Sequence, residues 1–419
     1  MFEDILLELY RKFWTGKNNF INRDIAINVV SGNSSYLLIG PRRAGKSTLL
    51  YEICDLLVEK GLSKEDFIFI NFEAPKLVNF KSENLDSILL TYNSIHPNKK
   101  PILLLDEIQH IDNWERYVRN LVDNQYRVFV TGSNSRMLNA NSRSLRGARF
   151  IEKKVLPLNF ECFLYFKGFT KRDVLIQPNA KIINLFREYL QYGGFPEVVL
   201  SNKKEDILTS YFELGVSDVL KTNSDFNELE IKLLLKKIRE NIKSEVTINS
   251  YNSFFKSIDY KIDKNKVYNY FQVFEDNFLV LSLSQYRKSL RTRSFGKKMY
   301  FIDNGYVSLF DVKEDFGLKL ENLIFLELYA TGRKIYYYKN DLECDFVVCE
   351  NDKVKECIQV TYELTDKDKS REVNGLLNAI TDLNLNSGVI LTYNQEQIIK
   401  QDKKTIYVKP VWKWLLGKK

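Results

Sequence analysis

The most constraining feature of this sequence is a glycine-bounded loop between an apolar strand and a helix. Residues 36–50 read YLLIGPRRAGKSTLL, in which Lys46 and Ser47 open an apolar-periodic helix. In the pattern GxxxxGK[ST], glycines let backbone N–H groups close around phosphate oxygens, the lysine reaches the β- and γ-phosphates, and the hydroxyl ligates magnesium. A plain glycine turn between a strand and a helix is the alternative. The expected nucleotide-binding residues are Gly40, Pro41, Arg42, Arg43, Ala44, Gly45, Lys46, Ser47 and Thr48.

A second apolar segment ends in two adjacent acids. Residues 101–107 read PILLLDE, and the apolar run favours a strand buried on both faces, as in a parallel sheet covered by helices. Ligands bind at the carboxyl ends of such strands. We expect Asp106 to hold magnesium through water and Glu107 to orient and polarise the attacking water. The alternative, a strand end with a solvated turn, is disfavoured by the loop that precedes it.

The next predicted strand, in YRVFVTGSNS, ends in small polar residues where a sensor of the γ-phosphate belongs. Ser133 and Asn134 are both candidates, and the sequence does not separate them. Such residues are also ordinary turn formers. Only their order after the strand with the two acids favours the sensor interpretation.

Arginines near these motifs have several interpretations. The side chains of Arg42 and Arg43 contact nucleotide, a neighbouring subunit or only solvent. The segment SRSLRGARF offers Arg146 and Arg149, and either is a candidate for the positive finger that stabilises transition-state charge. A finger donated between subunits would imply an oligomer, whereas a basic surface loop is the alternative.

Length and composition limit the class of protein. A chain of 419 residues is longer than one core of typical size, so we expect two or three domains. With 44% hydrophobic and 28% charged residues, it is not expected to be largely disordered or fibrous. The net charge of +8 permits an anionic partner without requiring one. Without a secretory leader or a membrane-length apolar run, the sequence predicts a cytoplasmic location.

Cysteine and histidine usage argues against metal sites based on these residues. Only two histidines are present, so the chemistry must come from carboxylates, lysine and backbone. The five cysteines include no CxxC pair, which argues against a disulfide framework or a zinc ribbon. Cys344 and Cys349 are an odd number of residues apart on one predicted strand, so alternation places them on opposite faces. We expect both to be small core residues.

Several further strings carry a family resemblance. They are INFE, LLLDEIQHIDNWE, TGSNS, SLRG, LPLNFECFL and QYGGFPEVV, together with GPRRAGKSTLL. With them, the chain resembles the archaeal-type ATPases of the extended AAA+ class over nearly its whole length. Members of that family join a P-loop core to a winged helix and a C-terminal domain resembling the PD-(D/E)xK nucleases.

The resemblance implies an α/β protein of four modules that binds ATP and magnesium. The modules are a P-loop AAA+ core with a parallel sheet and an N-terminal helix, a helical lid, a winged helix and a nuclease-like α/β domain. Their expected ranges are 1–157, 158–222, 223–312 and 313–419. Within the lid, Gly193 and Gly194 interrupt a helical stretch, and we expect them to form a tight turn that reverses the chain.

The middle module has the outline of a helix-turn-helix. From Glu228 to Lys243 the apolar spacing is helical, and the following stretch reads as helix, turn, helix and strand. In the second of these helices, apolar residues recur at three- and four-residue steps from Val267 to Phe274 and predict a core face. FLVLSL and KKMYFID are expected to pair as a hairpin.

The segment between these two strands is basic and contains no acid. Six cations on a hairpin tip would contact about six phosphates, enough for salt-dependent and largely sequence-independent duplex binding. DNA is therefore the expected partner, and an acidic protein partner is the alternative. The expected DNA-binding residues are Arg287, Lys288, Arg291, Arg293, Lys297 and Lys298.

The last hundred residues read as one helix followed by three strands. The resemblance suggests a nuclease-like fold, whose site needs a carboxylate on one strand and an acid and a lysine two residues apart on the next. Alternation places Glu343 and Asp345 on one face, and the candidate site is Glu321, Asp345 and Gln359. Gln359 stands where the acid is expected and Thr361 where the lysine is expected. Threonine cannot stabilise phosphate charge as an ammonium does, so we do not expect cleavage.

These patterns support three functional hypotheses. The leading one is an oligomeric, magnesium-dependent ATPase that couples its nucleotide state to the arrangement of the lid and winged helix on DNA. The second is a nucleotide-gated switch read by a protein partner, with slow hydrolysis. The third is an ATPase-coupled DNA nuclease. None of the three involves a membrane.

Overall fold

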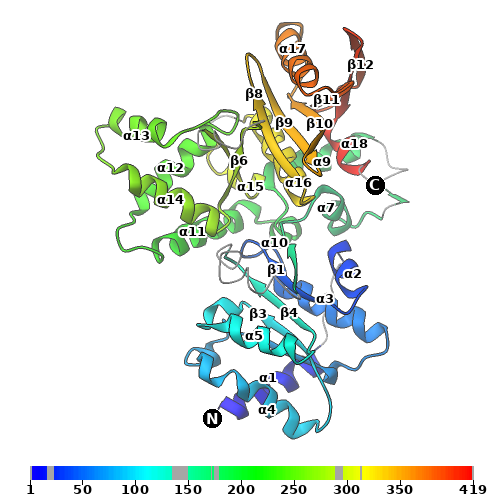
Figure 1. Ribbon diagram of the computed structural model, residues 1–419, viewed down its shortest axis with the longest axis vertical. Coiled ribbons are helices and arrows are strands. Elements are labelled where there is room, and N and C mark those ends of the chain that lie inside the picture. The colour runs from blue at the N-terminus through cyan, green and yellow to red at the C-terminus, as the bar shows by residue number, and fades with distance from the viewer. Residues whose placement is uncertain are drawn as a thin grey trace. The chain divides into compact units, whose positions relative to one another are not determined.

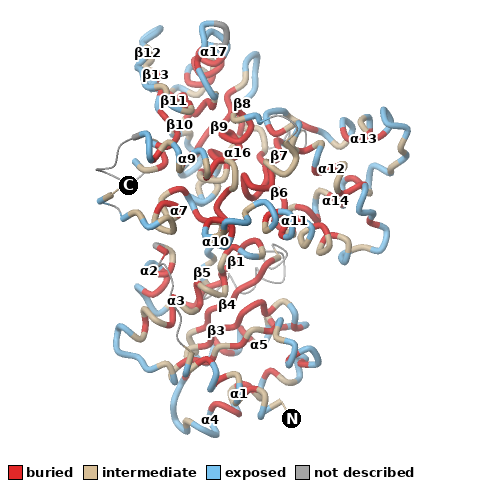
Figure 2. The backbone as a smooth tube through the Cα atoms, turned by 180° about the vertical axis from the view of Figure 1, so that it is seen from behind, coloured by how far each residue is buried: buried red, intermediate tan, exposed pale blue. Residues whose placement is uncertain are grey.

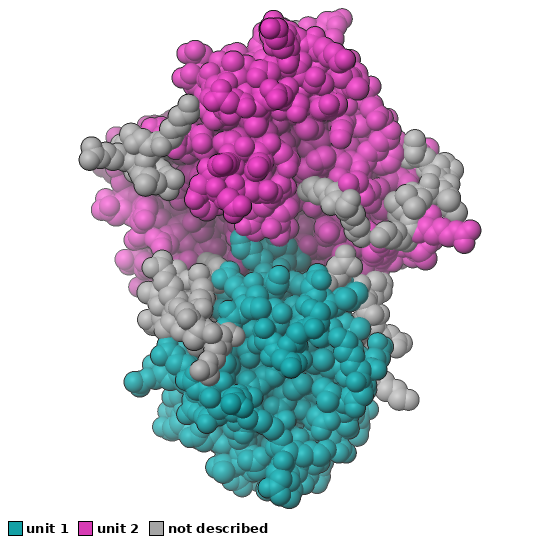
Figure 3. Space-filling model, turned by 45° about the vertical axis from the view of Figure 1, so that its right-hand side comes forward, with its two compact units in different colours: residues 1–156 teal, residues 157–419 magenta. Residues whose placement is uncertain are grey.

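The computed structural model describes residues 2–16, 23–134, 150–170, 172–173, 179–287, 296–311 and 314–417. The chain divides into two compact units, Met1–Leu156 and Pro157–Lys419, which are coloured separately in Figure 3. No helix within the described ranges combines the length and the apolarity needed to cross a membrane.

A five-stranded parallel sheet forms the centre of the first unit (Figure 1). Strand β4 lies between β1, which enters the glycine-bounded loop, and β3, which ends in Asp106. Because the strands are parallel, their carboxyl ends meet at one end of the sheet. The expected α/β fold with a parallel sheet is therefore confirmed. In sheet order the strands are β2 (Phe67–Asn71), β3 (Ile102–Asp106), β4 (Val128–Gly132), β1 (Ser35–Ile39) and β5 (Phe150–Lys154).

The central strands are buried on both faces, as their apolar runs predict. Leu103, Leu104 and Leu105 of β3 have no exposed surface, and Figure 2 shows the strands in the colour of buried residues. Helices and short 3-10 turns pack around the sheet (Figure 1). The helices are α1 (Phe2–Thr15), α2 (Asp24–Val30), α3 (Lys46–Glu59), α4 (Asp86–Ile95) and α5 (Trp114–Asp123). The turns are η1 (Lys64–Asp66), η2 (Pro75–Leu77), η3 (Ser82–Asn84) and η4 (Ile108–His110).

The N-terminal helix α1 is an integral part of this unit. Leu6, Tyr10 and Phe13 recur at helical spacing and are all buried. The Tyr10 hydroxyl also donates a hydrogen bond of 2.7 Å to the carbonyl oxygen of Ile88 in α4. Helix α1 is thus held against α4 by this hydrogen bond as well as by its apolar face.

The second unit opens with helices that surround the two adjacent glycines. Gly193 follows α9 with a left-handed φ of +72°, and the Gly194 amide donates to Asp303 Oδ2 at 2.8 Å. Asp303 is buried and also accepts the Gly305 amide. Burial raises the pKa of Asp303 to about 7, although both amides lower it. The glycines thus form a turn that also makes room for a buried carboxylate. The helices are α7 (Phe160–Phe166), α9 (Asn179–Tyr192), α10 (Pro196–Leu200) and α11 (Lys204–Leu220).

Three helices and an antiparallel hairpin follow. In α14, Val267, Tyr270 and Phe274 have no exposed surface, in agreement with the predicted core face. Val246, in the connection between α12 and α13, forms a bridge with Lys297 at the start of β7. The predicted order of helices and strands is therefore present. The elements are α12 (Glu228–Glu240), α13 (Ile248–Ser257), α14 (Lys264–Asp276), β6 (Val280–Ser284) and β7 (Lys297–Phe301).

A mixed six-stranded sheet completes the second unit, in the order β12-β13-β11-β10-β9-β8. The pairs β8–β9, β9–β10 and β12–β13 are antiparallel, whereas β10–β11 and β11–β13 are parallel. The predicted helix and three strands are α16, β8, β9 and β10. The helices of this region are α15 (Asn304–Ser308), α16 (Phe316–Ala330), α17 (Asp366–Asp382) and α18 (Val411–Leu416). Its strands are β8 (Lys334–Lys339), β9 (Glu343–Glu350), β10 (Lys353–Val360), β11 (Ser387–Thr392), β12 (Gln397–Gln401) and β13 (Lys404–Pro410).

Cys344 and Cys349 are both buried, as expected of small core residues, but an irregularity in β9 makes the expectation that they lie on opposite faces wrong. Tyr338 pairs with Cys344 but Tyr336 pairs with Val347, so β9 carries an extra residue between these pairs. A bulge of this kind shifts the alternation of side chains beyond it. Cys344 and Cys349 therefore belong to the same hydrophobic cluster. Both are free thiols, and the described residues contain no group of three His, Cys, Asp or Glu side chains arranged to hold a metal ion.

Replacing Gly193 with alanine is expected to lower the free energy of unfolding by about 3 kcal/mol or more. The added Cβ would lie 1.6 Å from Asp303 Oδ1, so the carboxylate must move away from the amides that it accepts. Urea unfolding of the full chain measures the effect.

The matched control is Gly332→Ala. Gly332 has the same φ of +72°, but nothing lies within 4 Å of its added Cβ. This change carries only the cost of the left-handed backbone, about 1–2 kcal/mol. Equal losses for the two variants would contradict the role assigned to the contact with Asp303.

Candidate functional site

The glycine-bounded loop forms a backbone cradle at the carboxyl end of β1. Arg43 and Gly45 have left-handed φ angles of +65° and +87°. A Cβ on Gly40 would lie 1.8 Å from the carbonyl oxygen of Val155, so only glycine fits where the loop passes the end of β5. Helix α3 begins at Lys46, and the N–H groups of its first turn project toward the loop. This arrangement suits the binding of an anion.

Lys46 is buried beside the loop and is paired with an acid. Its Nζ donates to the carbonyl oxygen of Pro41 at 3.0 Å and lies 3.0 Å from Glu107 Oε1. The Lys46 and Glu107 side chains are only 3% and 8% exposed. The lysine predicted to bind phosphate is therefore paired with the carboxylate predicted to activate water.

Asp106 accepts hydrogen bonds from two hydroxyl groups. Ser47 Oγ donates to Oδ2 at 2.7 Å, and Thr131 Oγ1 donates to Oδ1 at 2.6 Å. Thr131 in β4 also accepts the backbone N–H of Glu107 at 2.9 Å. Burial raises the pKa of Asp106, while the two hydroxyls oppose the rise. The sheet order explains this network, because β4 lies beside both β1 and β3.

The Glu107 carboxylate is held by groups from two strand ends. Its backbone φ is +52°, and Oε2 accepts a hydrogen bond of 2.5 Å from Gln109 Nε2. The same amide nitrogen donates to Ser133 Oγ at 3.2 Å. Burial alone would raise the pKa of Glu107, but Lys46, Gln109 and Ser133 outweigh it and lower the pKa below its usual value. An ionised carboxylate is what a general base requires.

The residues at this site fit a nucleoside triphosphate with a divalent cation. The backbone cradle and Lys46 supply positive potential for phosphate oxygens. The Ser47 hydroxyl and the Asp106 carboxylate lie together and are oxygen ligands of the type that magnesium prefers. Glu107 and Ser133 stand at the neighbouring strand ends, where they could reach the terminal phosphate.

Three residues of the site carry roles that were not predicted. Gln109 follows Glu107 by two positions, but its link to Ser133 depends on the distance between two strand ends. Thr131 is one of the small polar residues at the end of β4, and only its contacts identify it as a bridge. Arg23 is buried and donates to the carbonyl oxygen of Ala44, so it supports the loop from outside.

The arginine predictions have different outcomes. Arg42 pairs with Glu73 at 2.8 Å, and His110 lies 3.2 Å from the same oxygen. The finger candidates Arg146 and Arg149 lie outside the described residues.

Of the sensor candidates, Ser133 is joined to Glu107 through Gln109, whereas Asn134 is half-buried at the same strand end.

The expected DNA-binding set is wrong for Lys298. Its side chain has no exposed surface, so it cannot contact a phosphate from the surface. Lys297 is exposed, and Arg287 is half-buried, with its Nε donating to Gln285 at 2.9 Å. The other three residues of the set lie outside the described residues: Lys288, Arg291 and Arg293.

Lys298 lies instead among three carboxylates. Its Nζ is 3.1 Å from Glu321 Oε1, 2.7 Å from Glu343 Oε1 and 3.2 Å from Asp345 Oδ1. The Tyr300 hydroxyl donates to Glu321 at 2.9 Å. Burial and the nearby Asp345 raise the pKa of Glu321 to about 7, although Lys298 opposes the rise. Glu343 and Asp345 thus share a face as predicted, but their partner lysine comes from β7.

The candidate residues of the nuclease-like site lie close together around this cluster. Gln359 accepts the Asp345 amide at 3.2 Å, and its Nε2 donates to Glu372 at 2.7 Å. Thr361 donates its hydroxyl to the carbonyl oxygen of Glu363. A cavity of about 380 Å³ is lined by Glu321, Asp345, Gln359 and their neighbours. Glu372 and Lys298 also belong to this group, although the sequence pattern does not predict either of them there.

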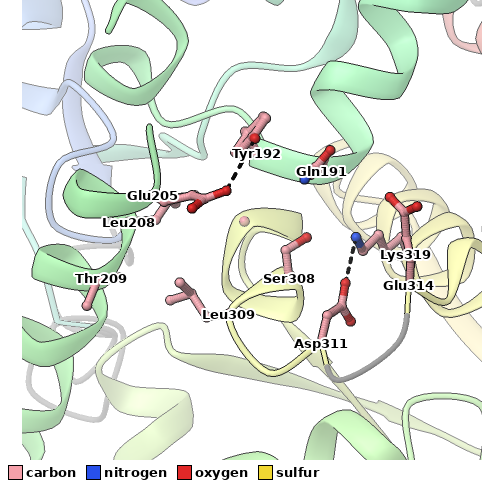
Figure 4. Close-up of a pocket in the computed structure, with 11 residues that line it drawn as sticks. Gln191, Tyr192, Glu205, Leu208, Thr209, Ser308, Leu309, Asp311, Glu314 and Lys319 are labelled. Carbon is pink, nitrogen blue, oxygen red and sulfur yellow. Dashed lines mark hydrogen bonds and ion pairs between the residues drawn. The ribbon is translucent and has the colours of Figure 1, made fainter. Parts of the chain in front are cut away.

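Another cavity, of about 370 Å³, lies between α9, α11 and the region of α15 (Figure 4). Lys319 and Asp311 form an ion pair of 2.7 Å in its wall, and the Tyr192 hydroxyl donates to Glu205 at 3.4 Å. These polar groups satisfy one another. The Ser308 hydroxyl also lines the cavity and has no hydrogen-bond partner among the described residues.

Comparisons with known proteins agree with this site. Residues 32–164 match an AAA domain, and residues 183–315 match a domain of unknown function, DUF8612. The uncharacterized protein MJ1544 of Methanocaldococcus jannaschii is 36% identical over 99% of this chain and 95% of its own length. An uncharacterized protein of Haemophilus influenzae is 27% identical over 81% of this chain and 85% of its own length. The Aeropyrum pernix Orc1 protein in complex with DNA aligns at 12% identity over 74% of this chain and 90% of its own, but its TM-score of 0.31 establishes no shared overall fold.

The loop, the two acids and the parallel sheet define a P-loop ATPase domain of the AAA class. At 36% identity over nearly the whole of both sequences, the chain belongs to the same family as the Methanocaldococcus jannaschii protein.

The bridging role of Thr131 can be tested by Thr131→Val, which keeps the shape of the side chain and removes the hydroxyl. We expect a loss of about 2 kcal/mol or more in the free energy of unfolding, because an Asp106 oxygen and the Glu107 amide lose a buried partner. Chemical denaturation measures the loss.

Thr91→Val is the matched control for this prediction. Thr91 is also buried in the first unit, but its hydroxyl has no hydrogen-bond partner in the described part of the chain. This change should be nearly neutral or stabilising. A similar cost at both positions would show that the hydroxyl of Thr131 has no special role.

Proposed function

We propose that the protein is a magnesium-dependent ATPase that acts as an oligomer and couples its nucleotide state to DNA binding. The observation that carries the ATPase part is the buried contact between Lys46 and Glu107 beside the Ser47–Asp106 hydrogen bond. The lysine is in contact with one acid and the hydroxyl with the other, and the two acids are adjacent in the chain, so the groups needed for phosphoryl transfer to water are gathered at one place.

Lys46 would exchange partners when ATP binds. Its ammonium has three donors, and Pro41 and Glu107 take two of them in this structure. The terminal phosphates of ATP carry more negative charge than one carboxylate and would attract the lysine away from Glu107. Since Lys46 helps to lower the pKa of Glu107, the carboxylate would become a stronger base when ATP is present. Substrate binding and activation of the base would thus be linked.

Ser47 and Asp106 would hold the cation, which neutralises charge on the phosphate oxygens when bound. Thr131 keeps Asp106 in position, and the same hydroxyl fixes the backbone of Glu107. Gln109 then orients the Glu107 carboxylate toward the site. Gln109 also donates to Ser133. Contact of Ser133 with the γ-phosphate would therefore affect the Glu107 carboxylate through Gln109. A finger arginine from another subunit, Arg146 or Arg149, would complete the site.

The assigned roles predict different defects for two variants. Lys46→Ala is expected to lose nucleotide binding, because it removes the charge that reaches the phosphates. Glu107→Gln is expected to retain ATP binding and to hydrolyse ATP at least about 100-fold more slowly, because the amide cannot accept a proton. Nucleotide-binding titrations and phosphate-release assays on the same preparations measure both effects.

Glu59→Gln is the control for the second variant. Glu59 lies at the exposed end of α3, so the same chemical change there should leave turnover unaltered. Rapid hydrolysis by Glu107→Gln would remove the role assigned to this carboxylate.

The proposed DNA-binding module consists of α12, α13, α14 and the β6–β7 hairpin, which together would form a winged helix. The exposed residues of α14 are Tyr268 and a set of basic or uncharged polar residues, and its half-buried acid, Glu275, lies 3.7 Å from Lys297. Such a surface suits a helix that lies in a groove. The basic residues of the hairpin segment, apart from the buried Lys298, would bind the phosphate backbone. The exposed polar residues of α14 are Lys264, Asn265, Asn269 and Gln272.

Charge reversal tests this module. The double variant Arg291→Glu and Arg293→Glu should nearly abolish binding to duplex DNA, and wild-type binding should weaken steeply with added salt. Fluorescence anisotropy at several salt concentrations measures both.

The control is Lys400→Glu with Lys403→Glu, which makes the same change in net charge on exposed residues around β12 and β13. It should leave most of the affinity intact. Equal losses in both double variants would attribute binding to overall charge and contradict a local DNA-binding surface.

A further inference from the structure

Lys298 contacts three acids that line the 380 Å³ cavity of the second unit, which we call the acidic pocket. Three oxygens lie within 3.2 Å of its Nζ, one each from Glu321, Glu343 and Asp345. An ammonium group has three N–H donors and no acceptor. One carboxylate oxygen is thus available for each donor, and no donor is left for a phosphate group.

The side chains around the lysine are also committed to protein partners. Asp345 uses its second oxygen to accept the Val360 amide at 2.9 Å. Gln359 accepts from the Asp345 amide and donates to Glu372, so both ends of its amide are used. These are the positions at which the nuclease-like pattern needs free oxygen ligands for a metal ion. With Lys298 in place, this arrangement of side chains does not fit a metal ion.

The charge balance also indicates that the pocket does not bind a metal ion. Burying one carboxylate is unfavourable unless it is paired, and here Glu321 and Asp345 are both almost fully buried. Lys298 is the cation that they share, together with the partly exposed Glu343. A divalent cation in the same place would meet the lysine ammonium and be repelled by it.

We propose that Lys298 is a built-in cation that replaces the metal ion of this pocket and locks the β6–β7 hairpin to the C-terminal sheet. The pocket therefore does not take up a divalent cation. Its acids instead hold the hairpin through their ion pairs with Lys298. This inference concerns the second unit and does not rest on ATP hydrolysis.

Contacts next to Lys298 join the hairpin strand β7 to helix α16. Asn322 of α16 accepts the Phe301 amide at 2.8 Å and donates to its carbonyl oxygen at 3.1 Å. The ring of Tyr300 stacks on Phe325 with centroids 4.2 Å apart. Lys298 thus lies at the start of a continuous interface between β7 and α16. Movement of the proposed DNA-binding hairpin would be transmitted directly to the C-terminal sheet.

Lys298→Met tests the proposal, because methionine keeps much of the length and removes the charge. The full chain without nucleotide should lose on the order of 10 °C in melting temperature, because three acids remain without their cation. It should also gain one Mn²⁺ site that the wild-type chain lacks, and millimolar Mn²⁺ should restore much of the lost stability. Electron paramagnetic resonance of added Mn²⁺ and thermal melts measure these effects.

Two further variants serve as controls. Lys297→Met changes the exposed neighbouring residue, whose Nζ lies 3.7 Å from Glu275 and donates to Ser282 Oγ at 3.3 Å. It should alter the melting temperature by no more than about 1 °C, because both contacts are long and exposed. If Lys298→Met does not fold, Lys298→Met with Glu321→Gln removes one of the unpaired charges and should recover folded protein.

The proposal is overturned if wild-type protein binds Mn²⁺ in this pocket and Asp345→Asn abolishes that binding. Mn²⁺-dependent DNA cleavage by the wild type that Lys298→Met abolishes would also overturn it, since the lysine would then serve catalysis. So would a Lys298→Met chain that melts like wild type and takes up no Mn²⁺.

Discussion

The buried ion pair between Lys46 and Glu107 is the interaction on which the site of the first unit depends. The pair forms because β4 holds β1 and β3 one strand apart, so that a loop and a strand end distant in the sequence meet. Removing one member of such a buried pair costs about 3–5 kcal/mol, because the other charge is left without a partner. A phosphate group is an adequate replacement partner, which makes the pair suitable for exchange during nucleotide binding.

The second unit also buries a lysine against acids, but with a different balance of charge. Lys46 faces one carboxylate and retains access to a backbone cradle, whereas Lys298 is surrounded by three carboxylates. An anion can compete for the first lysine but would be repelled by the acids around the second. Similar chemical groups therefore favour ligand binding in one unit and an internal structural contact in the other.

Much of the first unit follows from local sequence patterns. The apolar run before Asp106 predicts a buried strand, and the glycine positions predict the loop, because both depend on neighbouring residues alone. The same holds for the core face of α14 and for the shared face of Glu343 and Asp345. Alternation failed for Cys344 and Cys349 because a bulge arises from pairing with β8, which residues within β9 do not reveal.

Charge patterns were less informative, because a charged residue has the same appearance in sequence whether it is exposed or buried. Lys297 and Lys298 are adjacent, yet one is exposed and the other has no exposed surface. Their strand alternates, and only the packing of α16 and β9 against one face decides which lysine meets the acids. Gln109 and Thr131 likewise acquire their roles from residues on other strands.

The sequence by itself thus determined the phosphate-binding loop, the two acids after β3 and much of the order of helices and strands up to β10, since each depends on short-range periodicity and backbone geometry. The elements after β10 were not predicted. Tertiary structure alone decided which carboxylates Lys46 and Lys298 meet. The physical reason is that ion pairing acts over a few ångströms in space, and residues brought that close by sheet order and helix packing lie dozens of positions apart in the chain.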